Sequence, residues 1–483
     1  MAAEHDELMK SGWRLGATEL AAAFAAGTLT PLEVWQDCDA RIRALNPELN
    51  ALIAHNPEAE AAAEASTRRW SQGSPLSPLD GVPVTIKDNL NVAGLATTWG
   101  NKALAGRPAE DDELSVARCR RAGMVILGKT NVPEFTLEGY TDNPLFGVTR
   151  NPWNTALTPG GSSGGGVASV AAGFAPLAIG TDGGGSIRRP ASHTGLVGFK
   201  PSIGAVARVN SLPQVMLDFE VIGPIGRSVA DTATLFNIMA GEDARDRKSL
   251  RVAQCRVDCK TRPERLRILY VPRFGDHPLD PQIAASVAGA AEVLRAQGHE
   301  VTEGELPFSL DFVDAFWPML GAVAVAALFE RYPEAEPVAA EKFRAQAARG
   351  RDMGAAAYLN ALDDIDAFRR RVGAAFERVD VIMTPSAAAL PWPAEQGYPT
   401  EIDGQEVGPR GHAIYTGWVN ACGHPAINLP SAPAQQGLPI GFQLVGNFGD
   451  DELLFRLAAE YETAARAGWQ WPGETANTPD AKQ

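Results

Sequence analysis

Short apolar runs alternate with stretches of helical spacing along most of the chain. Residues 82–87, 122–131 and 175–179 form three of these runs, and each one ends in polar residues or glycine. Runs of this length, separated by segments in which apolar residues recur every three or four positions, predict strands that alternate with helices. This order is typical of an α/β fold, in which helices cover both faces of a central sheet.

The second half of the chain continues this pattern with one irregular stretch, residues 307–376, which is mainly helical. The spacing predicts an amphipathic helix over 227–241, a strand over 265–272, and a helix followed by a strand within 280–306. The remaining predicted elements are a strand within 379–388, strand-like runs at 423–432 and 437–446, and a final helix over 451–464.

The N-terminal residues 16–70 also have a helical pattern. Thr30, Pro31 and Glu33 supply the N-cap, the N1 proline and the N3 acid of a capping box. We therefore expect one large α/β domain with a mixed, mostly central sheet. Its expected parts are a helical N-terminal part (1–70), a core (71–306), a helical insertion that shapes the substrate pocket (307–376) and a C-terminal part of the same core (377–483).

Charge and cysteine content narrow the classes of partner. The 43 Lys and Arg residues face 58 Asp and Glu residues, which gives a net charge of −15. This acidity argues against a nucleic acid or an anionic membrane as partner, because both attract basic patches. The five cysteines are irregularly spaced, and Cys255 and Cys259 lack a second pair or nearby histidines. The sequence therefore predicts neither a disulfide framework nor a metal site.

Two segments bear on cellular location. The N-terminal "MAAEHDELMK" is polar and acidic, unlike the basic and then apolar plan of a signal peptide. The longest apolar run, 316–329, contains Pro318 and is shorter than the roughly 18 to 20 residues that a membrane span needs. We expect a cytoplasmic protein in which this run forms a buried or substrate-facing helix.

Lys87 ends an otherwise apolar strand, and two interpretations of it differ in chemistry. A lysine at the end of a strand is often simply exposed. A buried lysine, in contrast, has a lowered pKa because burial disfavours the charged ammonium, and it can then act as a general base.

The segment "TPGGSSGGG" at 158–166 places two serines among glycines. It fits neither G-x-G-x-x-G nor G-x-x-x-x-G-K-[ST], the phosphate-binding patterns. Ser163 does fit G-x-S-x-G, the nucleophile elbow of α/β-hydrolases, which requires a strand directly before it. The preceding "NPWNTALTPG" is rich in proline and poor in strand-forming residues, so the elbow is only an alternative here.

The segment "GTDGGGSIRRPA" at 180–191 follows an apolar strand and places Ser186 after three glycines. Consecutive backbone N–H groups in such a loop can converge on an anion and form an oxyanion hole. A serine that closes the loop would be well placed as a nucleophile. A plain tight turn is the alternative interpretation of this segment taken alone.

The chain resembles the amidase signature family in five segments, which extend from about residue 17 to 465. They are "GVPVTIKDN", "PGGSSGGGVASVAAG", "GTDGGGSIRRPASHTGLVGFKPS", "GPIGRSVADTATLFNIMAG" and "GHPAINLPSA…GLPIGFQLVG". The resemblance implies an amidase that cleaves the C–N bond of linear, non-peptide amides. It assigns the family's Ser–cis-Ser–Lys triad to Ser186 as nucleophile, Ser162 after a cis peptide bond as proton relay, and Lys87 as base.

The resemblance also assigns the surroundings of the triad. The oxyanion donors would be the backbone N–H groups of Gly183, Gly184, Gly185 and Ser186. Supporting roles fall on Ser163, Asp182 and Arg188. The aromatic residues available to line a substrate pocket include Phe316, Trp317, Trp392, Tyr415 and Trp418.

Two residues beside the motifs are expected to have no catalytic role. His193 lies seven residues after Ser186, but the triad requires no histidine, and we expect a structural role for it. Asp88 follows Lys87 directly in the strand, and adjacent strand residues point to opposite faces. We therefore expect Asp88 to face away from Lys87.

The implied partners are a small amide and water, with no cofactor, no metal, no nucleic acid and no membrane. Relatives include homodimers, so a homodimer is an open expectation. Two alternatives remain: the glutaminase (A-type) subunit of a tRNA-dependent amidotransferase, and a catalytically inactive binding or scaffold relative. The sequence does not identify the amide.

Overall fold

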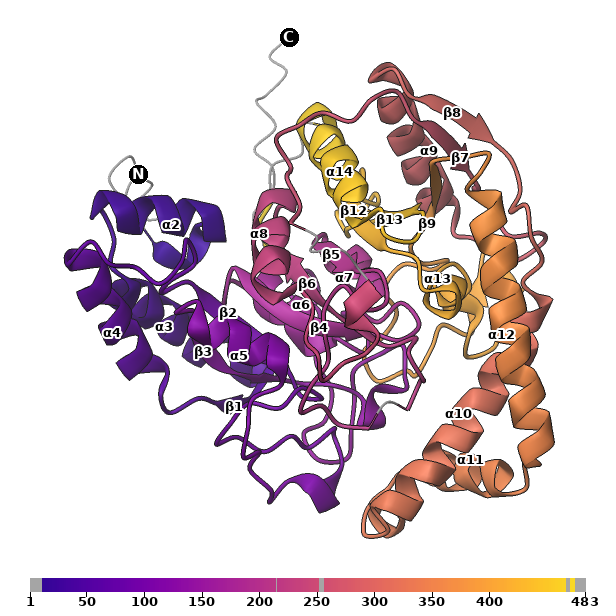
Figure 1. Ribbon diagram of the computed structural model, residues 1–483, viewed down its shortest axis with the longest axis horizontal. Helices are drawn as coiled ribbons and strands as arrows, with labels where there is room; N and C mark the ends of the chain where they lie inside the picture. The colour runs from indigo at the N-terminus through magenta and orange to yellow at the C-terminus, as the bar shows by residue number, and fades with distance from the viewer. Residues whose placement is uncertain (1–10, 214, 252–255, 466–469, 474–483) are drawn as a thin grey trace.

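The computed structural model describes residues 11–213, 215–251, 256–465 and 470–473. Its centre is a single 11-stranded sheet in the order β1-β3-β2-β4-β6-β5-β12-β13-β9-β7-β8 (Figure 1). The strands are β1 (Leu52–His55), β2 (Pro83–Lys87), β3 (Val125–Thr130), β4 (Leu177–Asp182), β5 (Val197–Lys200), β6 (Val221–Gly226), β7 (Arg267–Tyr270), β8 (Glu300–Glu303), β9 (Val381–Pro385), β12 (Ala426–Pro430) and β13 (Gly441–Gly446). A separate two-stranded ribbon pairs β10 (Glu401–Ile402) with β11 (Gln405–Glu406).

The sheet is mixed, as the sequence predicted. Strands β3, β2 and β4 run parallel to one another, and so do β9, β7 and β8. Between these two groups, the pairs from β4 to β9 through β6, β5, β12 and β13 are antiparallel. The parallel pair β2 and β4 is the part that concerns the site, because parallel strands bring their carboxyl ends to the same edge of the sheet.

The helices that cover the sheet fall into two groups, which are distinguished by the contacts between helices. Helix α8 contacts α5 and α14, and α14 contacts α9, whereas α6 contacts α7. The helices are α2 (Ala17–Ala26), α3 (Pro31–Leu49), α4 (Ala59–Ser71), α5 (Leu114–Arg121), α6 (Gly164–Ala171), α7 (Arg188–Thr194), α8 (Val229–Met239), α9 (Pro281–Ala296), α10 (Asp311–Arg331), α11 (Glu341–Arg351), α12 (Ala355–Ala375), α13 (Gly417–Cys422) and α14 (Asp451–Ala465).

Three strands of the central sheet were not predicted. Strand β1 lies inside the stretch that the sequence pattern assigned to helices, and its four residues are too few to show an alternation. Strand β5 is equally short. Strand β6 contains two glycines and a proline, which normally argue against a strand in the interior of a sheet. These strands are held by their neighbours in the sheet and not by local propensity.

Helices α10, α11 and α12 form a helical arm at one side of the molecule (Figure 1). Helix α10 has 21 residues and is longer than the apolar run seen in the sequence, with Pro318 inside it. By length and composition alone it could cross a membrane, but 56% of its most apolar window is buried inside the protein. It packs against α11, α12 and α13, which is how a core helix behaves.

Candidate active site

The site forms where β2 and β4 end. Strand β2 ends at Lys87, and β4 ends at Asp182 and continues through three glycines to Ser186 and α7. Because the two strands are parallel neighbours, Lys87 and the glycine loop lie at the same edge of the sheet. The two motifs that the sequence presents almost a hundred residues apart are therefore adjacent in space.

Lys87 is completely buried, which excludes the interpretation as an exposed lysine at a strand end. Its Nζ lies 2.8 Å from Ser162 Oγ, 3.0 Å from the Thr181 carbonyl oxygen and 2.9 Å from Thr181 Oγ1. Asp88 turns to the other side, as predicted, and pairs with Lys129 at 2.9 Å.

Burial lowers the pKa of Lys87 from its ordinary value to about 7. The nearby carboxylates of Glu220 and Asp182 oppose this shift, while the guanidinium of Arg208 adds to it. A substantial fraction of Lys87 is therefore neutral near pH 7, which is the condition for a lysine to accept a proton.

Ser162 follows a cis peptide bond from Gly161, as the family resemblance implied. A side chain on Gly161 would have no room, because an added Cβ would lie 2.5 Å from the Tyr140 carbonyl oxygen. The glycine here is thus a packing requirement of the turn that presents Ser162 to Lys87.

Ser163 lacks the setting of a nucleophile elbow. No strand directly precedes it in the described chain, and its side chain is fully buried. Its Oγ donates to the Thr181 carbonyl oxygen at 3.2 Å, and its backbone N–H donates to the Ser186 carbonyl oxygen at 3.2 Å. The contacts of Ser163 tie the two serine-bearing segments together.

Ser186 lines a cavity of about 950 Å³ together with Ser162, Gly183 and Gly184. Gly185 differs from the prediction, because its N–H donates to Asp182 Oδ1 at 2.7 Å and is already occupied within the loop. The backbone N–H groups left to face a substrate oxygen are those of Gly183, Gly184 and Ser186.

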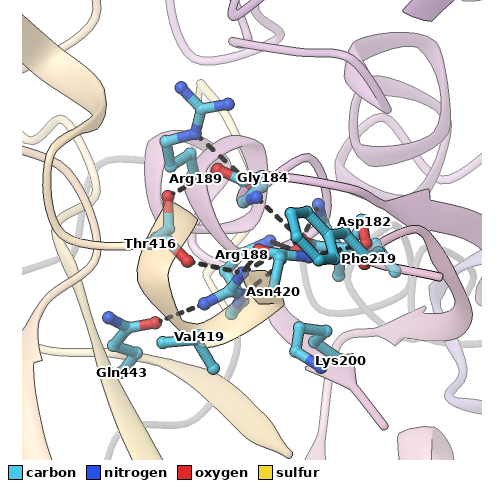
Figure 2. Close-up of polar contacts among 12 residues, drawn as sticks. Asp182, Gly184, Arg188, Arg189, Lys200, Phe219, Thr416, Val419, Asn420 and Gln443 are labelled. Carbon is cyan, nitrogen blue, oxygen red and sulfur yellow. Dashed lines mark hydrogen bonds and ion pairs between the residues drawn. The ribbon is translucent and has the colours of Figure 1, made fainter. Parts of the chain in front are cut away.

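Asp182 and Arg188 hold the glycine loop in place, and both side chains are fully buried (Figure 2). Arg188 donates to both oxygens of Asp182, at 2.9 and 3.0 Å. Asp182 also accepts from the Ile187 N–H and from Asn420 Nδ2, and Arg188 donates to Gln443 Oε1 at 2.7 Å. Arg188 and these hydrogen bonds keep the pKa of Asp182 well below its ordinary value despite burial.

Replacing Asp182 with asparagine is expected to destabilise the protein by about 3–5 kcal/mol, because it leaves the Arg188 charge buried without its partner. Urea unfolding followed by circular dichroism measures the change as a shift of the midpoint. Asp243→Asn is the control, since it removes an ion pair with Arg245 at the surface and should leave the midpoint nearly unchanged. Equal midpoints for the wild type and Asp182→Asn would contradict a stabilising role for the buried pair.

Two of the five aromatic residues proposed for the substrate pocket line the cavity. These are Trp317 and Trp418, and the indole of Trp317 lies so close to Gly184 that an added Cβ there would be 2.7 Å from it. The other three do not line this cavity and are buried elsewhere in the described structure. Those three corrected assignments are Phe316, Trp392 and Tyr415.

Several residues of the site were not found from the sequence. Thr181 binds Lys87, and Arg189, Glu220, Arg410 and His412 line the cavity. Thr181 and Arg189 stand inside the motif "GTDGGGSIRRPA", so the motif itself was a signal for them. The other three lie on segments outside the motifs that only the fold brings to the site.

His193 has the structural setting that was expected. It is buried against Trp392, edge to face, and burial lowers its pKa to about 3. Within the described residues, no group of three or more His, Cys, Asp or Glu side chains could hold a metal ion.

Comparison with known proteins extends the likeness beyond these motifs. The family model described as Amidase matches residues 33–455. The A subunit of glutamyl-tRNA(Gln) amidotransferase from Synechococcus sp. (strain CC9311) is 34% identical over 476 residues, which cover 91% of this chain and 95% of the relative. An acylamidase from Rhodococcus erythropolis is 34% identical over 469 residues, which cover 93% and 95%. The solved structure of 6-aminohexanoate cyclic dimer hydrolase complexed with substrate has a TM-score of 0.87 at 29% identity and covers 96% of this chain and 99% of that one.

Proposed function

This chain belongs to the amidase signature family, and from that premise we propose that it hydrolyses linear carboxylic amides through an acyl-enzyme on Ser186. Ser162 and Lys87 complete the proposed triad. The observation that carries the proposal is the buried contact of 2.8 Å between Lys87 Nζ and Ser162 Oγ, beside a cavity that Ser186 also lines.

The contacts of Lys87 suit a neutral amine. A neutral amine has two N–H groups and one lone pair, and Thr181 supplies two acceptors, its carbonyl oxygen and Oγ1. With both N–H groups bound to Thr181, the lone pair is left for the hydroxyl hydrogen of Ser162. Ser162 can then accept the proton of Ser186 as it passes its own proton to Lys87.

The reaction proceeds in two halves. The oxygen of Ser186 attacks the amide carbon, and the negative charge that develops on the carbonyl oxygen meets the free N–H groups of the glycine loop. The protons return through Ser162 to the departing nitrogen, and water then releases the acyl group by the same path. An oxyanion donor of this kind is worth about 2.7–4 kcal/mol of barrier.

A hydrolysis screen with anilides and primary amides tests the proposal. The expected results are release of aniline or ammonia by the purified chain alone, and an increase in protein mass by one acyl group on the peptide that contains Ser186 when the reaction is quenched early. Turnover with the acyl group attached to any other residue would contradict the assignment of the nucleophile.

A second candidate is the glutaminase (A-type) subunit of a tRNA-dependent amidotransferase. The specific observation in its favour is the 34% identity to the corresponding chain of such an enzyme. The two candidates differ in their need for partners. Hydrolysis of simple amides without any other protein supports a stand-alone amidase, whereas glutaminase activity that depends on a co-purified partner favours the second candidate.

The remaining expectations concern location and assembly. Cytoplasmic location, a homodimer, and the absence of cofactor, metal, nucleic acid and membrane partners stay predictions. The third alternative, an inactive scaffold, is disfavoured by the intact contact between Lys87 and Ser162. A fluorophosphonate probe that failed to label Ser186 would revive it.

A further inference from the structure

We infer that the cavity recognises a carboxylate on the substrate. Arg189 and Arg410 bind this carboxylate, on the side of the glycine loop where His412 lies. This inference rests on the proposed function and specifies its substrate class: amides that carry a second, negatively charged carboxyl group. Both arginines and His412 line the cavity that contains Ser186.

Arg189 is a buried cation without a carboxylate partner among the described residues. Its side chain is only 7% exposed, and it stands three residues after Ser186, in the first turn of α7. Its guanidinium contacts His412 Nε2 at 3.2 Å and the Gly185 carbonyl oxygen at 3.5 Å. Figure 2 shows this side chain extending away from Asp182, which is already bound by Arg188.

His412 does not neutralise Arg189. Burial and the charge of Arg189 hold the pKa of His412 well below its ordinary value, so the imidazole is neutral. A neutral imidazole offers Arg189 one acceptor and no counter-charge. A buried charge is normally paired, because the loss of hydration is otherwise uncompensated.

Arg410 is a second cation that lines the cavity, and it is solvent-exposed. Its guanidinium lies 4.7 Å from the ring centre of Trp317, the indole that packs on Gly184. The part of the chain that the structure describes gives Arg410 no ion pair, and its charge lowers the pKa of both Arg189 and His412. Both arginines line the same cavity, so an anion bound there would meet two positive charges.

The acidic residues that line the cavity form no ion pair with Arg189 in the described part of the chain. Glu138 pairs with Lys342 at 2.7 Å. Glu220 accepts from Asn89 at 2.7 Å and lies 3.5 Å from Arg208. The remaining charged lining residues are solvent-exposed, as Arg410 is. They are Asp314, whose charge raises the pKa of Arg410, together with Arg349 and Glu406.

A carboxylate suits this arrangement better than other groups. The planar guanidinium binds a carboxylate through two parallel N–H bonds, and such charge-assisted bonds are stronger where water is excluded. Because Arg189 is within one helical turn of Ser186, the carboxylate should be joined to the scissile amide by a short linker. The test below distinguishes a carboxylate on the acyl part from one on the amine part.

Two pairs of matched probes test the inference. For the acyl part, aniline release from N-phenylsuccinamate is compared with that from the neutral N-phenylsuccinamide. For the amine part, hydrolysis of 4-acetamidobenzoate is compared with that of 4-acetamidobenzamide. We expect kcat/KM to favour the anionic member of one pair by about tenfold or more, and the ratio to fall as salt rises. Ratios near one in both pairs would overturn the inference while leaving the proposed amidase function intact.

Variants locate the preference. Arg189→Gln and Arg410→Gln should each reduce the ratio of anionic to neutral kcat/KM by about tenfold. Arg370→Gln is the matched control, because Arg370 is exposed on α12 outside the cavity and its replacement removes the same charge. A ratio that stays unchanged in both Arg189→Gln and Arg410→Gln would overturn the assignment to these two residues.

Binding to Ser186→Ala separates this inference from the proposed function. Calorimetric titration of that variant should give a dissociation constant about tenfold lower for the anionic probe than for its neutral partner, whether or not either probe is hydrolysed by the wild type. If the wild type hydrolyses neither probe but Ser186→Ala still binds the anionic probe more tightly, only the proposed function is contradicted. Equal affinities would contradict carboxylate recognition.

Discussion

Replacement of Ser186 with alanine is expected to lower kcat for amide hydrolysis by about 10⁴-fold or more, because the acyl-enzyme cannot form without its hydroxyl. The cavity and the free backbone donors of the loop stay in place, so substrate binding should change far less than turnover. Steady-state kinetics on an anilide, with aniline quantified by chromatography, gives kcat and KM separately. A fall in kcat of less than tenfold would exclude Ser186 as the nucleophile.

Ser163→Ala provides the matched comparison for that measurement. Ser163 is the residue that the elbow pattern favours as nucleophile, yet its hydroxyl donates to the Thr181 carbonyl oxygen and is fully buried. We expect a partial loss of activity from this variant, since the hydrogen bond helps to hold Thr181 beside Lys87. Loss as severe as that of Ser186→Ala, with no acyl group found on Ser186, would instead favour the elbow alternative.

The sequence located the motifs of the candidate site because each motif depends on local features. An apolar strand that ends in lysine, and a strand that ends in a glycine loop and serine, can both be recognised within a dozen residues. Their adjacency followed from the family resemblance, and the structure adds the physical reason, since β2 and β4 are parallel neighbours. Lys87 and Ser186 could therefore be assigned to one candidate site from the sequence.

The substrate side of the cavity was harder to predict. Aromatic side chains are favoured both in cores and in pockets, so composition could not separate Trp317 from the buried Phe316 beside it on α10. The contact between Arg189 and His412 joins residues 223 positions apart, and nothing in the local pattern of either segment indicates it. The role of Gly185 could not be predicted from the sequence either. Only the structure shows that the Gly185 N–H already donates to Asp182.

Replacement of Lys87 with methionine is expected to lower kcat/KM by about 10²–10⁴-fold, the usual contribution of a general base. Lys87→Arg should be equally impaired, because a guanidinium keeps the positive charge but cannot release its proton to act as a base. If Lys87 served only as a buried cation that positions Ser162, Lys87→Arg would retain much more activity than Lys87→Met.

The pH dependence of the wild type tests the same role without a mutation. Burial lowers the pKa of Lys87 to about 7, and the neutral amine is the active form. The value of kcat/KM should therefore rise about tenfold per pH unit below pH 7 and level off above it, because this parameter reports the ionisation of the free enzyme. A profile that falls as the pH rises through 7 would mean that the ammonium form is active, and Lys87 could not then be the base. The carboxylates of Glu220 and Asp182 favour the charged lysine, so Glu220→Gln should move the midpoint of the profile to lower pH.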